Sequence, residues 1–280
     1  MKLNFSKMHG LGNDFVIINN LQLQHKFTAA EIKYIGDRKF GVGCDQILII
    51  DPADDGISDF YYKIFNSDGS IAGQCGNGAR CFIRYVVEHG LTKKKQIKLQ
   101  TTSRIISGQL ITSELIEVDM GVPEFSVEHI PLLMPQAAHY QLEIDNQTLK
   151  FSALSMGNPH AVIILSHEAQ LNNDAELSHI AQTLQHASFF PDSVNVNFVY
   201  IVDNSLIKLR TYERGCGFTL ACGSGACASA AALIKQNLVQ STLTIQMAGG
   251  ELNINWSEKN LLMRGAAVEV FNGTIELCVN

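Results

Sequence analysis

The sequence predicts an α+β fold made of two related halves, each with strands around one buried helix. Cys75 and Cys222 carry this prediction, because each opens a Cys-Gly-x-Gly-Ala turn that runs into an apolar helix, and they lie 147 positions apart (222 − 75) in a chain of 280 residues. The helix predicted over residues 78–88 is apolar nearly all round, and the one predicted over 225–236 consists mainly of small residues. Both patterns are typical of helices buried by a surrounding sheet.

Three further segments of the first half recur in the second half, in the same order. The corresponding residues are Asn13 and Asn158, Asp45 and Asn195, and Asn66 and Glu213, at offsets of 145, 150 and 147. Together with the cysteine turns they make four matched segments, which indicates an internal duplication. We expect the boundary between the halves at the Pro-containing stretch 121–135.

Short apolar or alternating runs between turn residues predict most of the strands. These runs cover residues 5–9, 15–19, 47–50, 60–65, 97–100, 103–110, 115–120, 194–199, 243–247, 252–256, 261–264, 268–271 and 274–279. Thr28 and Glu31 have the spacing of a capping box, so a further helix is predicted over 29–38.

Composition and charge describe an ordinary globular protein, with 46% hydrophobic and 17% charged residues. The net charge of −6 and the scattered Lys and Arg residues argue against a nucleic-acid surface. Neither a secretory apolar segment nor an apolar run of ~18 residues is present, so we expect a cytoplasmic protein without a membrane partner. Seven cysteines without Cys-x-x-Cys pairs predict free thiols rather than disulfides or a metal site.

The two cysteine turns predict acid–base chemistry by thiols. A thiol just before a helix lies against backbone N–H groups and the positive end of the helix dipole, which favours the thiolate and lowers the pKa toward neutrality. A single such turn is most often structural, but two matched copies favour Cys75 and Cys222 as base and acid on opposite faces of one Cα. No Gly-rich phosphate cradle accompanies a plausible Schiff-base lysine, so we expect no cofactor.

Five segments of the chain strongly resemble the diaminopimelate epimerase family. These segments are Lys7–Phe15, Gln74–Cys81, Ser155–His160, Tyr212–Gly215 and Ala221–Ala226. The resemblance covers nearly the whole chain and implies a cofactor-independent enzyme that interconverts LL- and meso-2,6-diaminopimelate in lysine and peptidoglycan precursor synthesis. It also implies two pseudo-symmetric domains, each a mostly antiparallel sheet around a central helix, formed by residues 1–119 with 270–280 and by residues 120–269.

Carried over residue by residue, the resemblance implies that Cys75 and Cys222 are the catalytic acid–base residues. It implies that the reacting carboxylate is held by backbone groups of Gly76, Asn77, Gly223 and Ser224. The other substrate-binding positions are Asn13, Gln46, Asn66, Asn158, Asn195, Glu213 and Arg214. Paired donors suit Arg214 to the distal carboxylate, and Glu213 can accept from the distal ammonium. His160 has two readings, as a residue that polarises a cysteine or as a hydrogen-bonded structural histidine.

Phe218 is the one conspicuous departure from the family pattern, since it stands where the family usually has a Glu. We expect it to leave the two-cysteine chemistry intact. Two alternatives stay open: a cofactor-independent racemase of another amino acid, such as histidine, and a non-catalytic amino-acid-binding homologue. The expected partner is a small amino-acid substrate, with neither nucleic acid nor metal, and a homodimer is one candidate oligomeric state.

Overall fold

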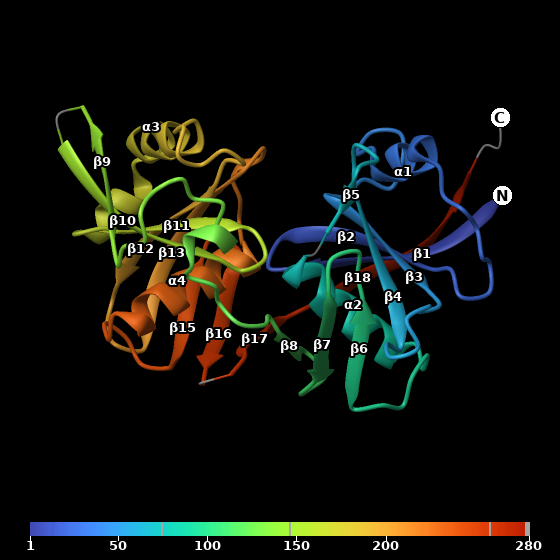
Figure 1. Ribbon diagram of the computed structural model, residues 1–280. Coiled ribbons are helices and arrows are strands. Elements are labelled where there is room, and N and C mark those ends of the chain that lie inside the picture. Colours follow the sequence, from blue (N-terminus) through green and yellow to red (C-terminus); the bar gives the residue numbers. More distant parts are fainter. Residues whose placement is uncertain (74, 146, 258, 278–280) are drawn as a thin grey trace. The chain divides into compact units, whose positions relative to one another are not determined.

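The computed structural model describes residues 1–73, 75–145, 147–257 and 259–277 (Figure 1). Gln74 of the first cysteine motif and Cys278 therefore lie outside the described residues. Within these ranges the chain forms four α-helices and an extensive set of strands. Its contacts divide it into two compact units, here called unit 1 (Met1–Asp119 and Arg264–Asn280) and unit 2 (Met120–Met263).

Unit 1 combines antiparallel and parallel strand pairs around helix α2. Its strands are β1 (Lys2–Gly10), β2 (Asn13–Asn19), β3 (Gln46–Asp51), β4 (Phe60–Asn66), β5 (Ile71–Ala72), β6 (Gln96–Gln100), β7 (Ile105–Leu110), β8 (Leu115–Asp119) and β18 (Val268–Glu276), and its helices are α1 (Ala29–Gly36) and α2 (Gly76–Glu88). The pairs β1–β2 and β3–β4 are antiparallel, whereas β2–β3 and β4–β6 are parallel. Strand β17 (Leu261–Ala266) crosses the division between the units.

Unit 2 repeats this sequence of pairings. Its elements are η1 (Val127–His129), β9 (Tyr140–Ile144), β10 (Gln147–Ser155), β11 (Pro159–Ile164), η2 (Glu168–Asn172), α3 (Asp174–Gln185), β12 (Asn195–Ile201), β13 (Leu206–Glu213), β14 (Gly217–Phe218), α4 (Gly223–Lys235), β15 (Thr242–Met247) and β16 (Gly250–Trp256). The pairs β10–β11 and β12–β13 are antiparallel, whereas β11–β12 and β13–β15 are parallel. An internal duplication accounts for the shared order.

The strand register corrects one of the expected correspondences. Phe15 on β2 pairs with Gln46, and His160 on β11 pairs with Asn195. Because Phe15 and His160 are themselves counterparts, at the offset of 145 found for the preceding asparagines, Asn195 corresponds to Gln46 and not to Asp45. The sequence comparison was therefore wrong by one residue here, a shift that would place every side chain of the strand on the opposite face.

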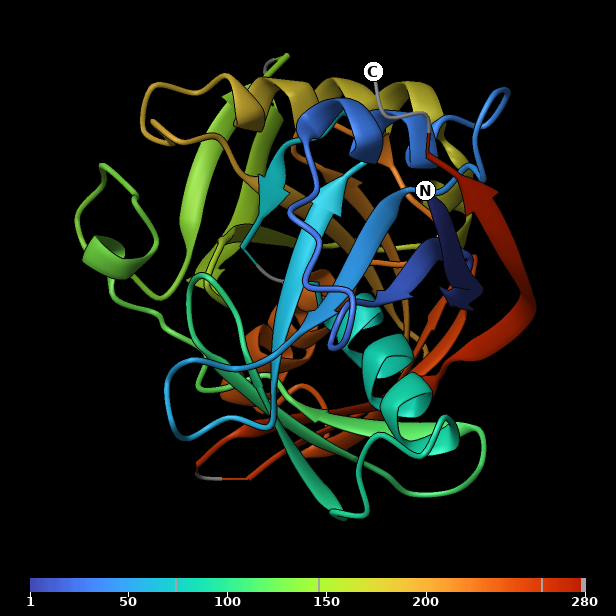
Figure 2. The same ribbon diagram turned by 90° about the vertical axis from the view of Figure 1, so that its right-hand side faces the viewer.

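Each unit surrounds one helix with its strands. Helix α2 packs against β1, β2, β7 and β8, and helix α4 packs against β10, β11, β12 and β16. Figure 2 shows α2 lying along the inner side of the strands of unit 1. The alanines of α4, such as Ala228 and Ala231, are completely buried and let the strands approach closely. These two central helices confirm the α+β class predicted from the repeated turns.

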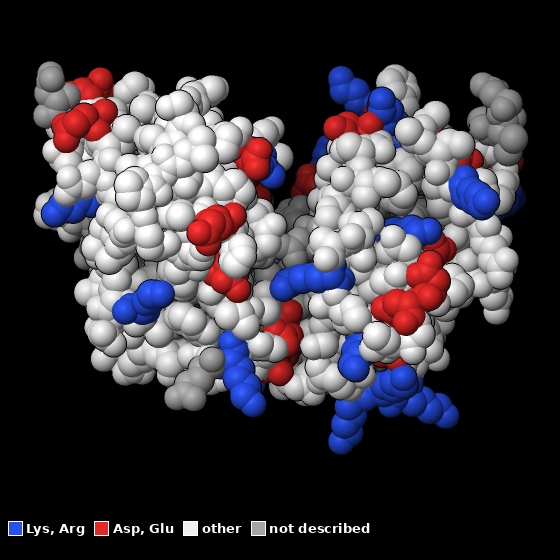
Figure 3. Space-filling model, viewed as in Figure 1, with Lys and Arg blue, Asp and Glu red and all other residues white. Residues whose placement is uncertain are grey.

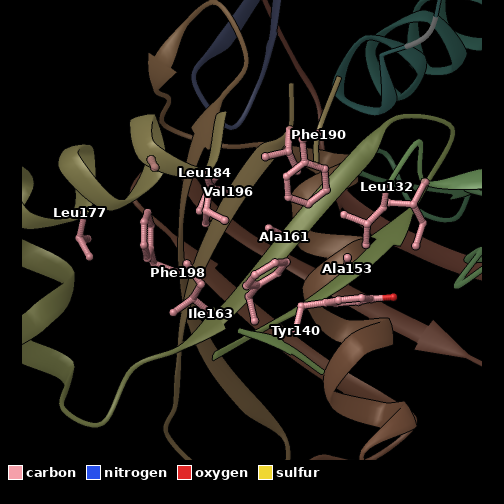
Figure 4. Close-up of a cluster of buried hydrophobic side chains, with 14 of the residues drawn as sticks. Leu132, Tyr140, Ala153, Ala161, Ile163, Leu177, Leu184, Phe190, Val196 and Phe198 are labelled. Atoms are coloured by element: carbon pink, nitrogen blue, oxygen red, sulfur yellow. The ribbon is translucent and has the colours of Figure 1, made fainter. Parts of the chain in front are cut away.

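Helix α3 was not predicted from the sequence. It buries Leu177, Ala181 and Leu184 against the hydrophobic core of unit 2, where Leu177 lies beside Phe198 and Leu184 beside Val196 of strand β12 (Figure 4). The spacing of these three residues is that of one helix face. At its start, Asn173 accepts a hydrogen bond of 3.3 Å from the backbone N–H of Glu176. The N-cap residue and the spacing of the apolar residues are the features of the sequence from which α3 could have been predicted.

The chain returns to unit 1 at Arg264, whereas the sequence placed the return at residue 270. Arg264 donates to the Glu117 carboxylate at 2.6 Å. Arg80 in helix α2 donates from Nε to the carbonyl of Ala266 at 3.1 Å. These contacts attach the residues just before β18 to strand β8 and helix α2, which explains the earlier boundary.

Local signals in the first half are reproduced closely. Thr28 and Glu31 form the predicted capping box of α1, with the Glu31 carboxylate accepting from the Thr28 N–H at 2.8 Å and the Thr28 hydroxyl accepting from the Glu31 N–H at 3.2 Å.

Acidic and basic side chains are interspersed on the visible face of each unit (Figure 3). Of the helices that the described residues form, none has the length and apolar character needed to cross a membrane.

Candidate active site

Cys75 and Cys222 occupy the same position in the two units, as the N-caps of α2 and α4. The N–H of Gly78 lies 3.4 Å from the Cys75 sulfur, and the N–H of Gly225 lies 3.4 Å from the Cys222 sulfur. Both cysteines have extended backbone angles, with φ −149° and ψ 111° for Cys75 and φ −122° and ψ 110° for Cys222. Each thiol thus lies at the positive end of a helix dipole, beside the first-turn N–H groups.

The side chain of Asn13 lies beside the first thiol. Its Oδ1 lies 3.8 Å from the Cys75 sulfur and 3.4 Å from Nδ2 of Asn77. Its Nδ2 donates to the Asp45 carboxylate at 2.8 Å. Because a carboxylate only accepts, the Asn13 amide is held with its nitrogen toward Asp45 and its oxygen toward the thiol.

An ion-pair network supports this arrangement, and the sequence analysis did not single it out. Asp14 accepts from Lys7 at 2.6 Å and from Arg38 at 2.8 and 3.0 Å, while Arg38 also donates to Asp45 at 2.7 Å. Burial raises the pKa of Asp14, but the hydrogen bonds from Arg38 and Lys7 outweigh it and leave the pKa well below the usual range. The sequence signal for this charged residue was the position of Asp14, directly after Asn13 in the segment Lys7–Phe15.

Gln46 and Asn66 lie opposite each other on adjacent strands β3 and β4. Gln46 donates from Nε2 to Oδ1 of Asn66 at 3.0 Å, and Asn66 donates from Nδ2 to Ser70 at 2.9 Å. Oδ1 of Asn66 is therefore occupied. Oε1 of Gln46 is buried and makes no hydrogen bond within the part of the chain that is described, which leaves it as an acceptor for a ligand.

Cys222 is more enclosed than its counterpart, with 6% of its surface exposed. Its sulfur lies 3.6 Å from the Ser224 hydroxyl. Burial, and then the negative charge of Glu213, raise the pKa of Cys222 well above the usual value, and the hydrogen bonds from Ser224 and Gly225 offset this only in part. The sequence predicted a lowered pKa from the helix dipole alone. For Cys222 that prediction is wrong, because desolvation favours the neutral thiol.

Glu213 and Arg214 follow one another at the end of β13 but have separate partners. Thr219 donates to the Glu213 carboxylate at 2.6 Å. The Arg214 backbone N–H donates to Oδ1 of Asn195 at 2.9 Å, and its guanidinium donates to the carbonyl of Asp192 at 2.5 Å. Arg214 and Asn158 line a cavity of about 380 Å³ within unit 2, together with His129, Pro131, Ser155, Gly157, Pro159 and Asp192.

His160 is completely buried, and both of its ring nitrogens contact asparagine side chains. Nε2 lies 3.1 Å from Oδ1 of Asn158, and Nδ1 lies 3.1 Å from Nδ2 of Asn197. Burial, and then the positive charge of Arg214, lower the pKa of His160 from 6.5 to about 3, so the imidazole is neutral. Asn197 was missed in the sequence, although two asparagines at alternate positions of an apolar strand were a visible signal.

Glycine is required at the third residue of each central helix. A Cβ at Gly78 would lie 3.3 Å from the Phe15 ring and 3.4 Å from Leu48, and would clash with the Tyr62 hydroxyl. A Cβ at Gly225 would lie 2.5 Å from Oδ1 of Asn197 and 2.8 Å from the Thr211 hydroxyl. In both units the helix therefore begins in direct contact with the sheet beneath it.

Phe218, the departure from the family pattern, packs on strand β13. Its ring lies 4.0 Å from the Arg210 guanidinium carbon and 5.0 Å, edge to face, from the Tyr212 ring. It thereby holds β14 against β13, and the next residue, Thr219, contacts Glu213. Within the described ranges no cluster of His, Cys, Asp and Glu has the geometry of a metal site.

Known proteins resemble the chain over almost its full length. A family model described as diaminopimelate epimerase matches residues 5–126 and 152–270. The diaminopimelate epimerase of Nitrosospira multiformis is 45% identical and covers 99% of each chain, and that of Pseudomonas savastanoi pv. phaseolicola is 44% identical over 99% of this chain and all of its own.

Solved structures share the fold at much lower identity. A hydroxyproline epimerase from Agrobacterium vitis superposes with a TM-score of 0.73 at 14% identity, covering 98% of this chain and 92% of its own. A phenazine biosynthesis protein of the PhzF family from Bacillus anthracis gives a TM-score of 0.70 at 14% identity, covering 99% and 100%. Together, the matching family model and the full-length relatives show that this chain belongs to the diaminopimelate epimerase family.

Proposed function

We propose that this chain interconverts LL- and meso-2,6-diaminopimelate, in lysine biosynthesis, with Cys75 and Cys222 as its acid–base pair. The epimerase activity is the one that its full-length relatives are named for. The assignment of the cysteines rests on one observation, their identical place at the start of the two central helices, where each sulfur accepts the N–H of the third helical residue.

The chemistry asks for one base and one acid on opposite faces of the reacting Cα. One thiolate removes the α-proton while the other thiol delivers a proton to the opposite face, and the roles exchange when the reaction reverses. The raised pKa of Cys222 keeps it as a thiol in this structure. We therefore assign to Cys222 the role of proton donor in the first turnover from this state.

Negative charge builds up on the carboxylate as the α-proton leaves, so donors must be aimed at it. The backbone N–H groups of Gly76 and Asn77 begin α2, and those of Gly223 and Ser224 begin α4. Donors preorganised in this way stabilise a transition state by about 3 kcal/mol each. Four such groups, with two helix dipoles, supply the electrostatic stabilisation that a reaction without a cofactor requires.

The remaining polar residues bind the non-reacting end of the substrate. Arg214 and Asn158 line the cavity of unit 2, and Asn195 accepts from the Arg214 backbone, so a carboxylate in this cavity would meet a guanidinium and an amide. Glu213 can accept from the distal ammonium. In unit 1, the hydrogen-bonded pair Gln46 and Asn66 supplies further polar groups for the same end of the substrate.

Incubation with LL-diaminopimelate in heavy water tests the proposal directly. We expect meso product that carries deuterium at the inverted Cα, because the delivered proton comes from a thiol in exchange with solvent. Reduced, folded protein that gives no exchange would contradict the assignment. A panel of amino acids tests the racemase alternative, which requires faster exchange with a substrate that lacks the distal carboxylate.

The enzyme is also proposed to act in the cytoplasm as a homodimer. Exposed apolar side chains on β18 support association, since 55% of Val270 and 49% of Phe271 is exposed. Light scattering on the eluting protein should then give about twice the chain mass of 30.8 kDa. A single species at the chain mass would contradict the dimer without touching the assigned chemistry.

A further inference from the structure

A chain of four hydrogen-bonded side chains runs across the sheet beneath helix α4. Thr211 donates to Oδ1 of Asn197 at 3.0 Å, Nδ2 of Asn197 lies 3.1 Å from Nδ1 of His160, and Nε2 of His160 lies 3.1 Å from Oδ1 of Asn158. Thr211, Asn197 and His160 are at most 3% exposed, so water does not compete for these groups. Only Asn158 reaches the cavity of unit 2.

One backbone carbonyl fixes which group donates and which accepts in each hydrogen bond between these four side chains. The carbonyl of Ala161 accepts from the Asn197 side chain at 3.1 Å, and a carbonyl cannot donate, so the group facing it is the amide nitrogen. The same nitrogen faces Nδ1 of His160, which must then be the accepting nitrogen. In a neutral imidazole the proton therefore lies on Nε2, which donates to Oδ1 of Asn158.

With its oxygen occupied, Asn158 is left with its amide nitrogen for a ligand. Its counterpart in unit 1, Asn13, is held the opposite way, with the nitrogen on Asp45 and the oxygen toward the Cys75 thiol. In unit 1 the positions of His160 and Asn197 are taken by Phe15 and Leu48, which cannot orient an amide. The polar chain is thus a property of unit 2 alone.

We propose that Asn197 is a positioning residue that, anchored by Thr211, sets the His160 tautomer and thereby holds Asn158 as a hydrogen-bond donor toward the carboxylate at the non-reacting end of the substrate. The low pKa of His160 supports this reading, because a neutral ring has one donor and one acceptor and can transmit direction. The proposal rests on the proposed function in taking that carboxylate as the ligand of Asn158.

The tautomer can be measured directly in the intact, ligand-free protein. In protein labelled with ¹⁵N-histidine, long-range ¹H–¹⁵N spectra distinguish a protonated from an unprotonated ring nitrogen, and loss of one set of signals in His160→Gln assigns the residue. We expect Nε2 to carry the proton and Nδ1 to be bare at pH 7. A proton on Nδ1 in the unsubstituted protein would overturn the proposal.

The Asn197→Asp variant should reverse the donor and acceptor roles of the two His160 ring nitrogens. A carboxylate only accepts, so His160 must then donate from Nδ1. At about pH 9, where the ring is neutral, Nε2 becomes the acceptor and the Asn158 amide turns its oxygen to the ligand. We expect KM for diaminopimelate to rise about tenfold or more, the loss of a hydrogen bond to a charged group, with a smaller change in kcat. Asn253→Asp, which adds the same charge at an exposed position of unit 2, is the matched control.

These measurements separate the proposal from the function on which it rests. If Asn197→Asp raises KM while the proton stays on Nε2, the effect is simple charge repulsion and the positioning role is wrong. An unchanged KM with the proton moved to Nδ1 is equally contrary to it. Failure of the unsubstituted protein to exchange deuterium refutes the proposed function, whereas the tautomer is read without any substrate. Should Asn197→Asp not fold, the tautomer of the unsubstituted protein still decides.

Discussion

The two halves of the molecule share a scaffold but differ in what lies beneath the scaffold's central helix. In unit 1 the start of α2 rests on Phe15, Leu48 and the Tyr62 hydroxyl. In unit 2 the start of α4 rests on Asn197 and Thr211, with His160 hydrogen-bonded behind them. The helix caps themselves are the same. A duplicated fold can therefore keep one chemical function in both copies while the supporting residues diverge toward different tasks.

The difference extends to the thiols. Cys75 is partly exposed, with Oδ1 of Asn13 3.8 Å from its sulfur, whereas Cys222 is 6% exposed and lies near the charged Glu213. A neighbouring carboxylate disfavours the thiolate, and here it adds to the effect of burial on Cys222. The raised pKa of Cys222 suits this thiol to donate a proton.

The largest expected effect comes from removing either sulfur, because the proposed two-cysteine mechanism requires both halves for inversion. Cys75→Ala and Cys222→Ala should each lower kcat for epimerisation by about 10³-fold or more, within the range for loss of a positioned acid or base. Cys216→Ala, which removes an exposed thiol of unit 2, is the control and should leave kcat unchanged. Full activity in either test variant would show that the halves do not contribute one residue each.

A methyl group at the third residue of each helix tests the two supporting surfaces. Gly78→Ala and Gly225→Ala should each lower the free energy of unfolding in urea by about 3 kcal/mol, the upper range for overpacking. Adding Tyr62→Phe should recover part of the loss at Gly78 only, since the Tyr62 hydroxyl is the nearest obstacle there. Gly56→Ala, with φ +67° and open space around it, controls for backbone strain alone. Equal losses at all three glycines would contradict the packing account.

The pH dependence of stability should differ between the two halves, because His160 in unit 2 can take up a proton and its counterpart in unit 1, Phe15, cannot. The folded pKa of about 3 lies below the unfolded value of 6.5, so the unfolded chain takes up the proton first. Stability is then complete above about pH 6.5 and falls as the pH drops toward 3. Between pH 7 and 5 this residue should account for about 2 kcal/mol of lost unfolding free energy. Urea titrations of His160→Gln should lack this loss, and titrations of the control His186→Gln should retain it.

The smallest effect should appear in thiol reactivity. Glu213→Gln removes the charge that, after burial, most raises the pKa of Cys222. We expect alkylation of Cys222 by iodoacetamide at pH 8 to become about three- to tenfold faster, read by mass spectrometry of the peptide, with the Cys75 peptide as internal control. A rate that is unchanged or slower would mean that burial alone sets the acidity of this thiol.

Local features of the sequence predicted local structure well. The capping box of Thr28 and Glu31 depends on residues within one helical turn and is found as expected. The two helices after the cysteine turns are also found, but they begin at Gly76 and Gly223, two residues earlier than predicted, which makes the cysteines their N-caps. The repeated order of segments likewise predicted two related halves. The match of Asn195 with Asp45 failed because alternating strands look alike when shifted by one residue, and only pairing with the neighbouring strand fixes the register.

The rest depended on contacts between distant segments. Asn197, His160 and Thr211 come from three strands, and nothing in the sequence around any one of them shows that their side chains meet. The pKa of Cys222 was predicted with the wrong sign because a helix N-terminus is visible in sequence, whereas the burial of the thiol and the approach of Glu213 are not. Burial is a property of the folded chain as a whole.

The pairing of β1 with β18 has a consequence for the folding of unit 1. Lys2 lies opposite Glu276, and the terminal amino group of Met1 donates to the carbonyl of Leu277, so unit 1 is assembled from both ends of the chain. Unit 2 is continuous in sequence, from Met120 to Met263. Strand β1 therefore stays without its partner β18 until the segment that follows unit 2 is available, so the two segments of unit 1 can complete their pairing only late in folding. Removal of β18 would leave β1 without this partner strand, so we expect a truncation there to disturb unit 1 more than unit 2.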